Sequence, residues 1–467
     1  MMLQTQKKLK YNSNLFLIIL TKSLVAIFAT GLFIVDSLGK DLSNEKNNSL
    51  LLKPISNLSD KEYDKFILGK SFFRIPWVEA PSATTARDGL GPLFNANTCM
   101  SCHPGNGRGN LYNAKGEFSR SLIPKLSIPS NNTKEHNEIL KKEGLIPEPI
   151  YGKQISINAI HGVKFEAKPN ITYKKRKVKF PDGEVDILLE PIYSLKQLQY
   201  GPLDKDAILT FRIAPSLNGL GLLSDISNED ILKNEDQFDK NNDGISGRAN
   251  YVYSPITKKI ELGKYSWKAT TTSILHQTAD AANNDMGLSS KYYQNENCTK
   301  EQKNCNHAPK SRDPIDITDL RLDAMVFYLK KRKTYSIDKN SKIYKDGIKI
   351  FKQISCNKCH IESFVTKSGI EIAPFTDMLL HNMGEDLADG RSEYKASGSE
   401  WRTAPLWGLA LHEKINKKTP RLLHDGRARD FQEAILWHGG EAAKSKELYK
   451  NLKKEERKKL LEFLKEV

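Results

Sequence analysis

Apolar side chains recur at helical spacing in the C-terminal half of the chain. One stripe is formed by Leu322, Met325, Val326 and Leu329, at positions i, i+3, i+4 and i+7. Thr318 or Asp316 can cap the start of this helix, and the basic run 330–333 suits the negative end of its dipole. The pattern therefore predicts a helix that starts near residue 318 and ends in the basic run.

Two more amphipathic stretches follow a linker that reaches about Asn340. The first leads to Cys356 and carries an apolar face made of Ile343, Ile350, Phe351 and Ile354. The second runs from about Lys444 to Lys465. Both stretches are predicted to be helices.

The region from 151 to 213 has a different pattern. Residues 178–189 contain two alternating apolar and polar runs around a Pro-Asp-Gly turn, which is typical of a β-hairpin. We expect a small β-sheet at about 151–213, inserted between helical segments.

The N-terminus combines basic and apolar residues. Four lysines precede an apolar run from Leu24 to Val35: Lys7, Lys8, Lys10 and Lys22. This layout is typical of a secretory signal, and the run is shorter than the roughly 20 residues of a membrane span. Residues 1–40 are predicted to be a signal peptide or an uncleaved N-terminal anchor. An exported, periplasmic protein is expected, with membrane contact only through such an anchor.

Composition limits the remaining classes of protein. With 467 residues, 39% hydrophobic and 27% charged, the chain is globular and long enough for two or three domains. The net charge of +16 would suit nucleic acid, an anionic membrane or an acidic protein. No nucleic-acid motif accompanies the scattered lysines, so no nucleic-acid partner is expected. A solvated lysine-rich surface is the simplest interpretation.

The six cysteines fall into three close pairs, and two pairs belong to CxxCH motifs. The motifs are formed by Cys99, Cys102 and His103, and by Cys356, Cys359 and His360. Two thiols three residues apart can each bond one vinyl group of a haem, while the adjacent histidine ligates the iron. We therefore predict two covalently bound haems c, with His103 and His360 as proximal ligands.

Zinc and a thioredoxin-like redox pair are the alternatives to haem. Structural zinc sites usually pair two CxxC knuckles about 15–20 residues apart, whereas these pairs are 257 residues apart. A redox pair would need a surrounding βαβ pattern, which the flanking sequence lacks.

The third pair, Cys298 and Cys305, is predicted to form a local disulfide in an exported chain. Closing so short a loop would stabilise the fold by roughly 2–3 kcal/mol.

A short acidic stretch resembles the front of a calcium-binding loop. Asp239, Asn241 and Asp243 place oxygen ligands on alternate residues, and Gly244 allows the bend. The closing glutamate of an EF-hand is missing, because Asn250 stands at the twelfth position. The stretch is either a calcium site of another kind or an Asp/Asn-rich turn.

Since c-type domains wrap haem with helices, the expected fold is mainly α. Two cytochrome c-like haem domains are expected. The first spans 41–333 and includes the β insertion, and the second spans 334–467.

Several segments outside the CxxCH motifs resemble one protein family. They are RDGLGPLFNA at 87–96, APSLNGLGLL at 214–223, DGISGR at 243–248, DMG at 285–287, EWRTAPLWG at 400–408 and LHDGRA at 423–428. The chain thereby resembles the bacterial di-haem oxidoreductases, which are peroxidase-like or thiol-oxidoreductase-like proteins distantly related to the di-haem cytochrome c peroxidases.

The resemblance implies an exported oxidoreductase that reduces peroxide or another small oxidant. Electrons from a small cytochrome or cupredoxin would pass through the C-terminal haem to the N-terminal haem. Two alternatives stay open: an electron-transfer protein without a substrate, and an oxidase that modifies a partner protein.

The resemblance also suggests a distal ligand for the second haem. In the related peroxidases a methionine occupies the segment where this chain has His438, and Met383 is the alternative ligand. Two imidazoles usually give a lower reduction potential than a histidine–methionine pair, so the familiar division of labour between the haems is open to question.

The catalytic residue of the first haem is not identified by the sequence. The stretch 267–286 is the best candidate for its distal wall, with Trp267 between the haems and His276 as a residue that closes the site. A core aromatic and a surface histidine are the alternatives for these two positions.

Overall fold

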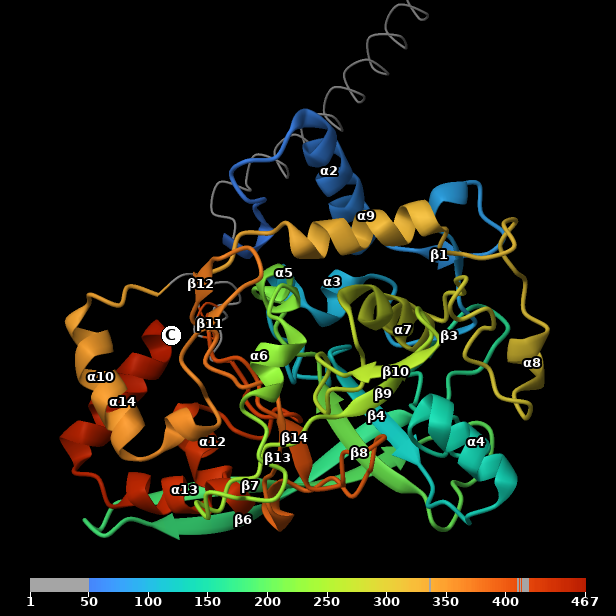
Figure 1. Cartoon of the computed structure of the whole chain (residues 1–467). Helices are drawn as coiled ribbons and strands as arrows, with labels where there is room; N and C mark the ends of the chain where they lie inside the picture. The colour runs from blue at the N-terminus through green and yellow to red at the C-terminus, as the bar shows by residue number, and fades with distance from the viewer. Residues whose placement is uncertain (1–49, 336, 410, 412, 414–419) are drawn as a thin grey trace, which may run out of the picture. The chain divides into compact units, whose positions relative to one another are not determined.

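The structure is a computed structural model that describes residues 50–467 except 336, 410, 412 and 414–419 (Figure 1). The predicted signal peptide or anchor at 1–40 lies outside the described residues. Among the described helices, none is long and apolar enough to cross a membrane.

Two helices pack closely in the N-terminal half. Helix α2 (Asp60–Arg74) begins at a capping box formed by Ser59 and Glu62. It packs on α9 (Asp319–Lys330), which confirms the helix predicted from the apolar stripe. Gly69 is required at the contact, because a Cβ there would lie 1.9 Å from the carbonyl oxygen of Ala324.

Short helices carry much of the remaining N-terminal half. They are α3 (Cys99–Cys102), α4 (Lys134–Glu143), α5 (Leu220–Ser224), α6 (Asn228–Leu232), α7 (Ile274–Met286) and α8 (Lys303–Asn306). The strands of this half are β1 (Val78–Glu79), β2 (Asp88–Leu90), β3 (Leu93–Phe94), β4 (Leu122–Ser127), β5 (Asn158–Ala159), β6 (Lys168–Lys179), β7 (Val185–Lys196), β8 (Ile208–Ile213), β9 (Tyr251–Ser254) and β10 (Lys259–Leu262).

The predicted hairpin is confirmed and is longer than its sequence signal. Strands β6 and β7 pair antiparallel along their full length, with Lys168 opposite Lys196 and Lys179 opposite Val185. Strand β8 does not join them and instead pairs with β4. At the turn, Phe180 enters the hydrophobic core of the C-terminal half.

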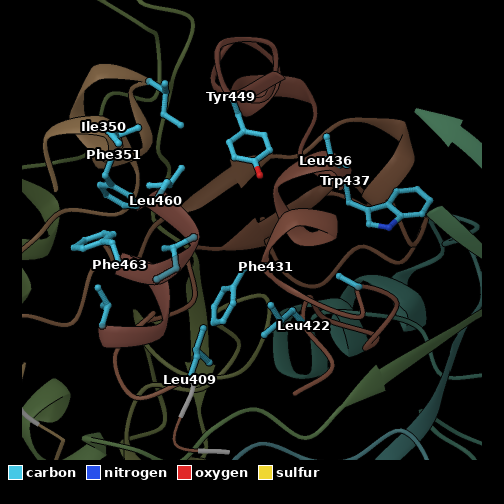
Figure 2. Close-up of a cluster of buried hydrophobic side chains, with 14 of the residues drawn as sticks. Ile350, Phe351, Leu409, Leu422, Phe431, Leu436, Trp437, Tyr449, Leu460 and Phe463 are labelled. Atoms are coloured by element: carbon cyan, nitrogen blue, oxygen red, sulfur yellow. The ribbon is translucent and has the colours of Figure 1, made fainter. Parts of the chain in front are cut away.

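The C-terminal half contains α10 (Lys342–Gln353), α12 (Phe431–Trp437), α13 (Ala443–Lys450) and α14 (Lys454–Glu466). Its strands are β11 (Phe364–Val365), β12 (Glu371–Ile372), β13 (Leu380–Asn382) and β14 (Glu400–Arg402). Figure 2 shows side chains of α10, α12 and α14 gathered in one apolar cluster, among them Ile350, Phe351, Phe431, Leu436, Leu460 and Phe463. The last predicted helix is two helices, which are separated where Leu452 turns into this cluster.

The expectation of a mainly α fold is wrong. The structure is 31% helix and 20% strand, and the described strands form seven two-stranded sheets. Many strands have only two or three residues, too few to show an alternating pattern. They form because tertiary packing brings distant segments together, as when Leu380–Asn382 pairs with Glu400–Arg402.

Candidate functional site: two CxxCH motifs and a shared cavity

The first CxxCH motif forms one short helix, α3. Thr98 caps it by accepting a hydrogen bond from the Ser101 backbone amide at 3.0 Å. The ring Nδ1 of His103 donates to the carbonyl oxygen of Pro215 at 2.9 Å. Burial lowers the pKa of His103 to about 4, so the imidazole is neutral. With Nδ1 engaged, its Nε2 lone pair is available to a metal, as in most histidine ligands.

The second motif repeats this arrangement on a different backbone. Cys356–Lys358 is a single 3-10 turn that follows α10. Nδ1 of His360 donates to the carbonyl oxygen of Phe375 at 2.9 Å. Burial, together with nearby His438, lowers the pKa of His360 to about 4. Both motif histidines are therefore neutral and held through Nδ1.

The four motif cysteines are not joined to one another in the structure. Burial raises the pKa of Cys99 and of Cys356 to about 12. A reactive redox pair needs a thiolate stabilised by positive charge, so this environment disfavours the thioredoxin-like alternative.

A cavity lies beside the second motif. Cys356, Cys359 and His360 line it, and so do His438 and Met383. Much of the rest of its wall is apolar and includes side chains labelled in Figure 2: Phe351, Leu409, Leu422, Phe431 and Leu460. Two thiols, an axial imidazole and a large apolar cavity are the features that a haem c requires, so these residues fit the group.

His438 has the same bonding pattern as the two motif histidines. It follows α12, and its Nδ1 donates to the carbonyl oxygen of Ala434 at 2.6 Å. Its pKa is lowered by burial, which leaves Nε2 unprotonated and able to ligate. Met383 lines the same cavity, so both predicted distal ligands are placed near His360.

The cavity also reaches residues that support the first motif. Pro215, which accepts the hydrogen bond from His103, lines it, and so does Trp267. The Trp267 indole donates to the Ile213 carbonyl at 2.8 Å, and the Arg108 guanidinium lies 5.0 Å from its ring. Trp267 therefore lines the same cavity as the second motif and as Pro215, and its position between the haems stays a prediction.

His276 is not brought to either motif cavity. It lies in the first turn of α7, buried, with Nδ1 3.4 Å from the Thr272 hydroxyl. Burial lowers its pKa. It does not line the cavity beside the second motif, so a role in closing the site stays a prediction.

Asp285 is a half-buried carboxylate near the first motif that the sequence did not single out as a catalytic residue. Burial raises the pKa of Cys99 and Cys102, and the charge of Asp285 raises both further. Burial also raises the pKa of Asp285, whose Oδ1 accepts from the Gln154 amide at 2.9 Å. It lies in α7, within the stretch predicted as distal wall, and it begins the DMG segment of the family resemblance, but the sequence predicts no chemical role for it.

A second cluster missed by the sequence lies beside Cys359. His381 Nε2 is 2.7 Å from an Asp377 carboxylate oxygen, and its Nδ1 is 2.6 Å from Glu441. Glu441 also accepts from Ser246. These side chains brace one wall of the cavity, and no local motif could show that they meet.

The predicted calcium residues satisfy one another and their own loop. Asp239 accepts from the Gly244 amide, Asn241 from the Asp243 amide, and Asp243 pairs with Lys358 at 3.2 Å. In the described part of the chain, no group of three or more His, Cys, Asp or Glu residues could hold a metal ion. Calcium binding stays a prediction without further support.

Cys298 and Cys305 are joined in the structure, with an S–S distance of 1.98 Å. Inside the closed loop, the Gln302 amide donates to buried Glu166 at 2.5 Å. The loop also contacts α7, because Asn297 donates to the Asn284 carbonyl at 3.2 Å.

The chain is similar to known proteins in two comparisons. The model of the family described as "Di-haem oxidoreductase, putative peroxidase" matches residues 39–467. No curated protein matches the chain. Among solved structures it is similar to Kuenenia stuttgartiensis hydrazine synthase pressurised with 20 bar xenon, at 19% identity and a TM-score of 0.23. That match covers 34% of this chain and 63% of the other, and it is too low to carry an argument. Because the family model spans most of the sequence, the chain belongs to the di-haem oxidoreductase family.

Proposed function

We propose that this chain is an exported c-type cytochrome that binds two haems covalently and reduces peroxide with electrons from a small redox protein. One observation carries the proposal: both CxxCH motifs present a neutral histidine held through Nδ1 by a backbone carbonyl. When bound, haem supplies an iron that accepts and passes on electrons and, at an open coordination position, reduces a small oxidant.

At the second motif, His360 and His438 are the proposed axial ligands. Both line the cavity, and both have Nδ1 bonded to a backbone carbonyl. Two protein ligands leave no position for a substrate, so this site is suited to electron entry.

At the first motif, Asp285 is the proposed base. Peroxide reduction requires a proton to move from one oxygen to the other, which then leaves as water. A carboxyl group with a raised pKa can take and return that proton, and the Gln154 amide holds its position. Trp267, which lines the cavity beside the second motif, would conduct electrons from the second site to the first.

The proposed donor is a small acidic cytochrome or cupredoxin that docks on β6. Four lysines on this strand are exposed: Lys174, Lys175, Lys177 and Lys179. Between them, Arg176 pairs with Asp386 at 2.7 Å and lies 5.6 Å from the ring of Trp437, the neighbour of His438. The lysine row therefore lies close to the ligand segment of the second haem.

Peroxide consumption by the holoprotein, with reduced plastocyanin as an acidic donor, tests the proposal. Asp285→Asn should slow peroxide reduction by at least about 100-fold while both haems stay attached. Asp280→Asn, in the same helix, should retain the rate.

Other outcomes would favour the alternatives. Two haems that do not react with peroxide in any redox state would identify an electron-transfer protein. Peroxide consumption only beside a protein that becomes modified would identify a modifying oxidase.

A further inference from the structure

A stacked pair of rings lies in the wall of the second-motif cavity. Trp401 and His424 both line the cavity, with ring centroids 3.7 Å apart and an angle of 10° between their planes. Both side chains are buried, and Nε2 of His424 makes no hydrogen bond in the structure. Two rings in such close contact are well coupled electronically, so an electron can pass between them toward the cavity.

Positive charge surrounds Trp401. The Lys268 ammonium lies 4.2 Å from its ring centroid, and the Arg212 guanidinium lies 5.1 Å away. Cations over an aromatic face disfavour removal of an electron from it, because the product would be a radical cation. An electron vacancy would therefore not remain on Trp401.

A tyrosine is linked to the stacked pair through one carboxylate. Tyr193 of β7 donates its phenolic hydrogen bond to Asp425, whose Oδ2 lies 3.7 Å from Nε2 of His424. Arg427 holds the same carboxylate at 2.6 Å. Burial would raise the pKa of Asp425, but Arg427, His424 and the tyrosine lower it to about 2. Asp425 is therefore ionised and able to accept a proton.

We propose that Tyr193 is a redox-active tyrosine that donates one electron toward the haem cavity through His424 and Trp401, and its phenolic proton to Asp425. The inference rests on the proposed peroxidase function, because peroxide is the oxidant. Peroxide takes up two electrons and two protons to give two water molecules. Tyr193 supplies one of these electrons, and the second comes from the reduced protein itself.

The product would be a neutral tyrosyl radical in a protected place. Tyr193 stacks on buried Phe211 with ring centroids 4.8 Å apart. The phenol cannot ionise first, because burial and Asp425 raise its pKa well above the usual value. Electron and proton must leave together, and Asp425 provides the acceptor. Such a site would hold an oxidising equivalent away from the haems while no donor protein is bound.

Strand β6, which pairs with β7, offers a matched control. Tyr173 of β6 also lies in this region, but its hydroxyl faces that of Tyr112 at 3.1 Å rather than a carboxylate. Tyr173 therefore lacks the charged proton acceptor that distinguishes Tyr193.

The test is rapid-freeze EPR of the holoprotein, partly reduced and mixed with hydrogen peroxide without donor, with tyrosine either unlabelled or ring-deuterated. Wild type should give a radical signal that narrows on deuteration. Tyr193→Phe should lose at least 80% of this signal, and Tyr173→Phe should retain it. Asp425→Asn should lower its yield at unchanged haem spectra.

A full signal in Tyr193→Phe, or no tyrosine signal while peroxide is consumed, would overturn the inference and leave the proposed function standing. Failure to consume peroxide would overturn both. Unchanged optical spectra of Tyr193→Phe would show that the variant folds.

Discussion

Single hydrogen bonds decide how the histidines near the cavity can be used. His103, His360 and His438 each donate from Nδ1 to a backbone carbonyl, which leaves Nε2 available to a metal. His381 is different, because carboxylates occupy both of its ring nitrogens. Burial would lower the pKa of His381, but Asp377 and Glu441 raise it well above the usual value. His381 is therefore a structural cation and not a ligand.

Replacing His438 tests its role as distal ligand. His438→Ala should change one of the two haems from low-spin to high-spin, and His438→Met should raise the reduction potential of that haem. Optical and EPR spectra with a redox titration provide the measurement. Met383→Leu is the control and should change neither property. The opposite result for the two positions would assign the ligand to Met383.

Replacing Glu441 tests the ion pair between Glu441 and His381. Burial would raise the pKa of Glu441, but His381 lowers it to about 2 from 4.5. A lowered carboxyl pKa adds stability above pH 4.5, and this contribution disappears as the pH falls toward 2. Glu441→Gln should therefore cost about 2 kcal/mol at pH 7 and progressively less below pH 4.5.

Denaturant unfolding of the holoprotein at several pH values measures this difference. Glu447→Gln removes an exposed carboxylate paired with Lys450 and should stay within about 0.5 kcal/mol of wild type. A pH-independent loss in Glu441→Gln would contradict the ionic role.

At the scale of elements, the long hairpin joins the two halves of the chain. Near its base, Ile171, Tyr193 and Leu195 pack on the cluster around Trp267 and Trp401. Near its turn, Phe180 and Leu188 pack in the C-terminal cluster. Arg457 of α14 pairs with Asp182 and Glu184 at 2.6 Å each, which fixes the turn. The hairpin is thus part of both cores.

Shortening the Phe180 side chain at the hairpin turn should weaken the C-terminal core. Phe180 is 4% exposed, so Phe180→Ala should lower the free energy of unfolding by about 3 kcal/mol. Val185→Ala, at a position that is 44% exposed, should change it by less than about 0.5 kcal/mol. Chemical denaturation followed by haem absorbance measures both. Equal effects would show that the tip does not belong to the core.

On the scale of the whole molecule, part of the net charge of +16 is concentrated in the lysine row of β6. Arg176, within the lysine row of β6, lies 5.6 Å from the ring of Trp437, the neighbour of His438, whereas Asp285 belongs to α7 and acts on the cysteines of the first motif. On the proposed function, electrons and substrate would therefore approach different motifs. Long-range attraction of an acidic donor would speed its association at low ionic strength.

Reversing the lysine row tests donor docking. Changing Lys174, Lys175, Lys177 and Lys179 to Glu should lower the second-order rate with reduced plastocyanin by at least about 10-fold at low salt, and the difference should shrink as salt is added. Stopped-flow reduction of the haems measures the rate. The matched control changes Lys134, Lys141, Lys142 and Lys310, four exposed lysines outside this strand, and should leave the rate nearly unchanged.

Several elements were predictable because their signals are local. The stripe ending at Leu329, the hairpin at 178–189 and the helix before Cys356 each follow from periodicity within a few turns. The fold class was not predictable in this way. Seven small sheets arise from pairings between strands too short to show a period, so a mainly α fold was the wrong expectation.

The sequence by itself determined the two CxxCH motifs of this family member, because each motif places its thiols and histidine within five consecutive residues. Tertiary structure decided everything that joins distant segments. Tyr193 and Asp425 are 232 residues apart, and His381 and Glu441 are 60 apart. The reason is physical: a side chain's pKa, hydrogen bonds and redox role depend on burial and on neighbouring charges, and these exist only once the chain has packed.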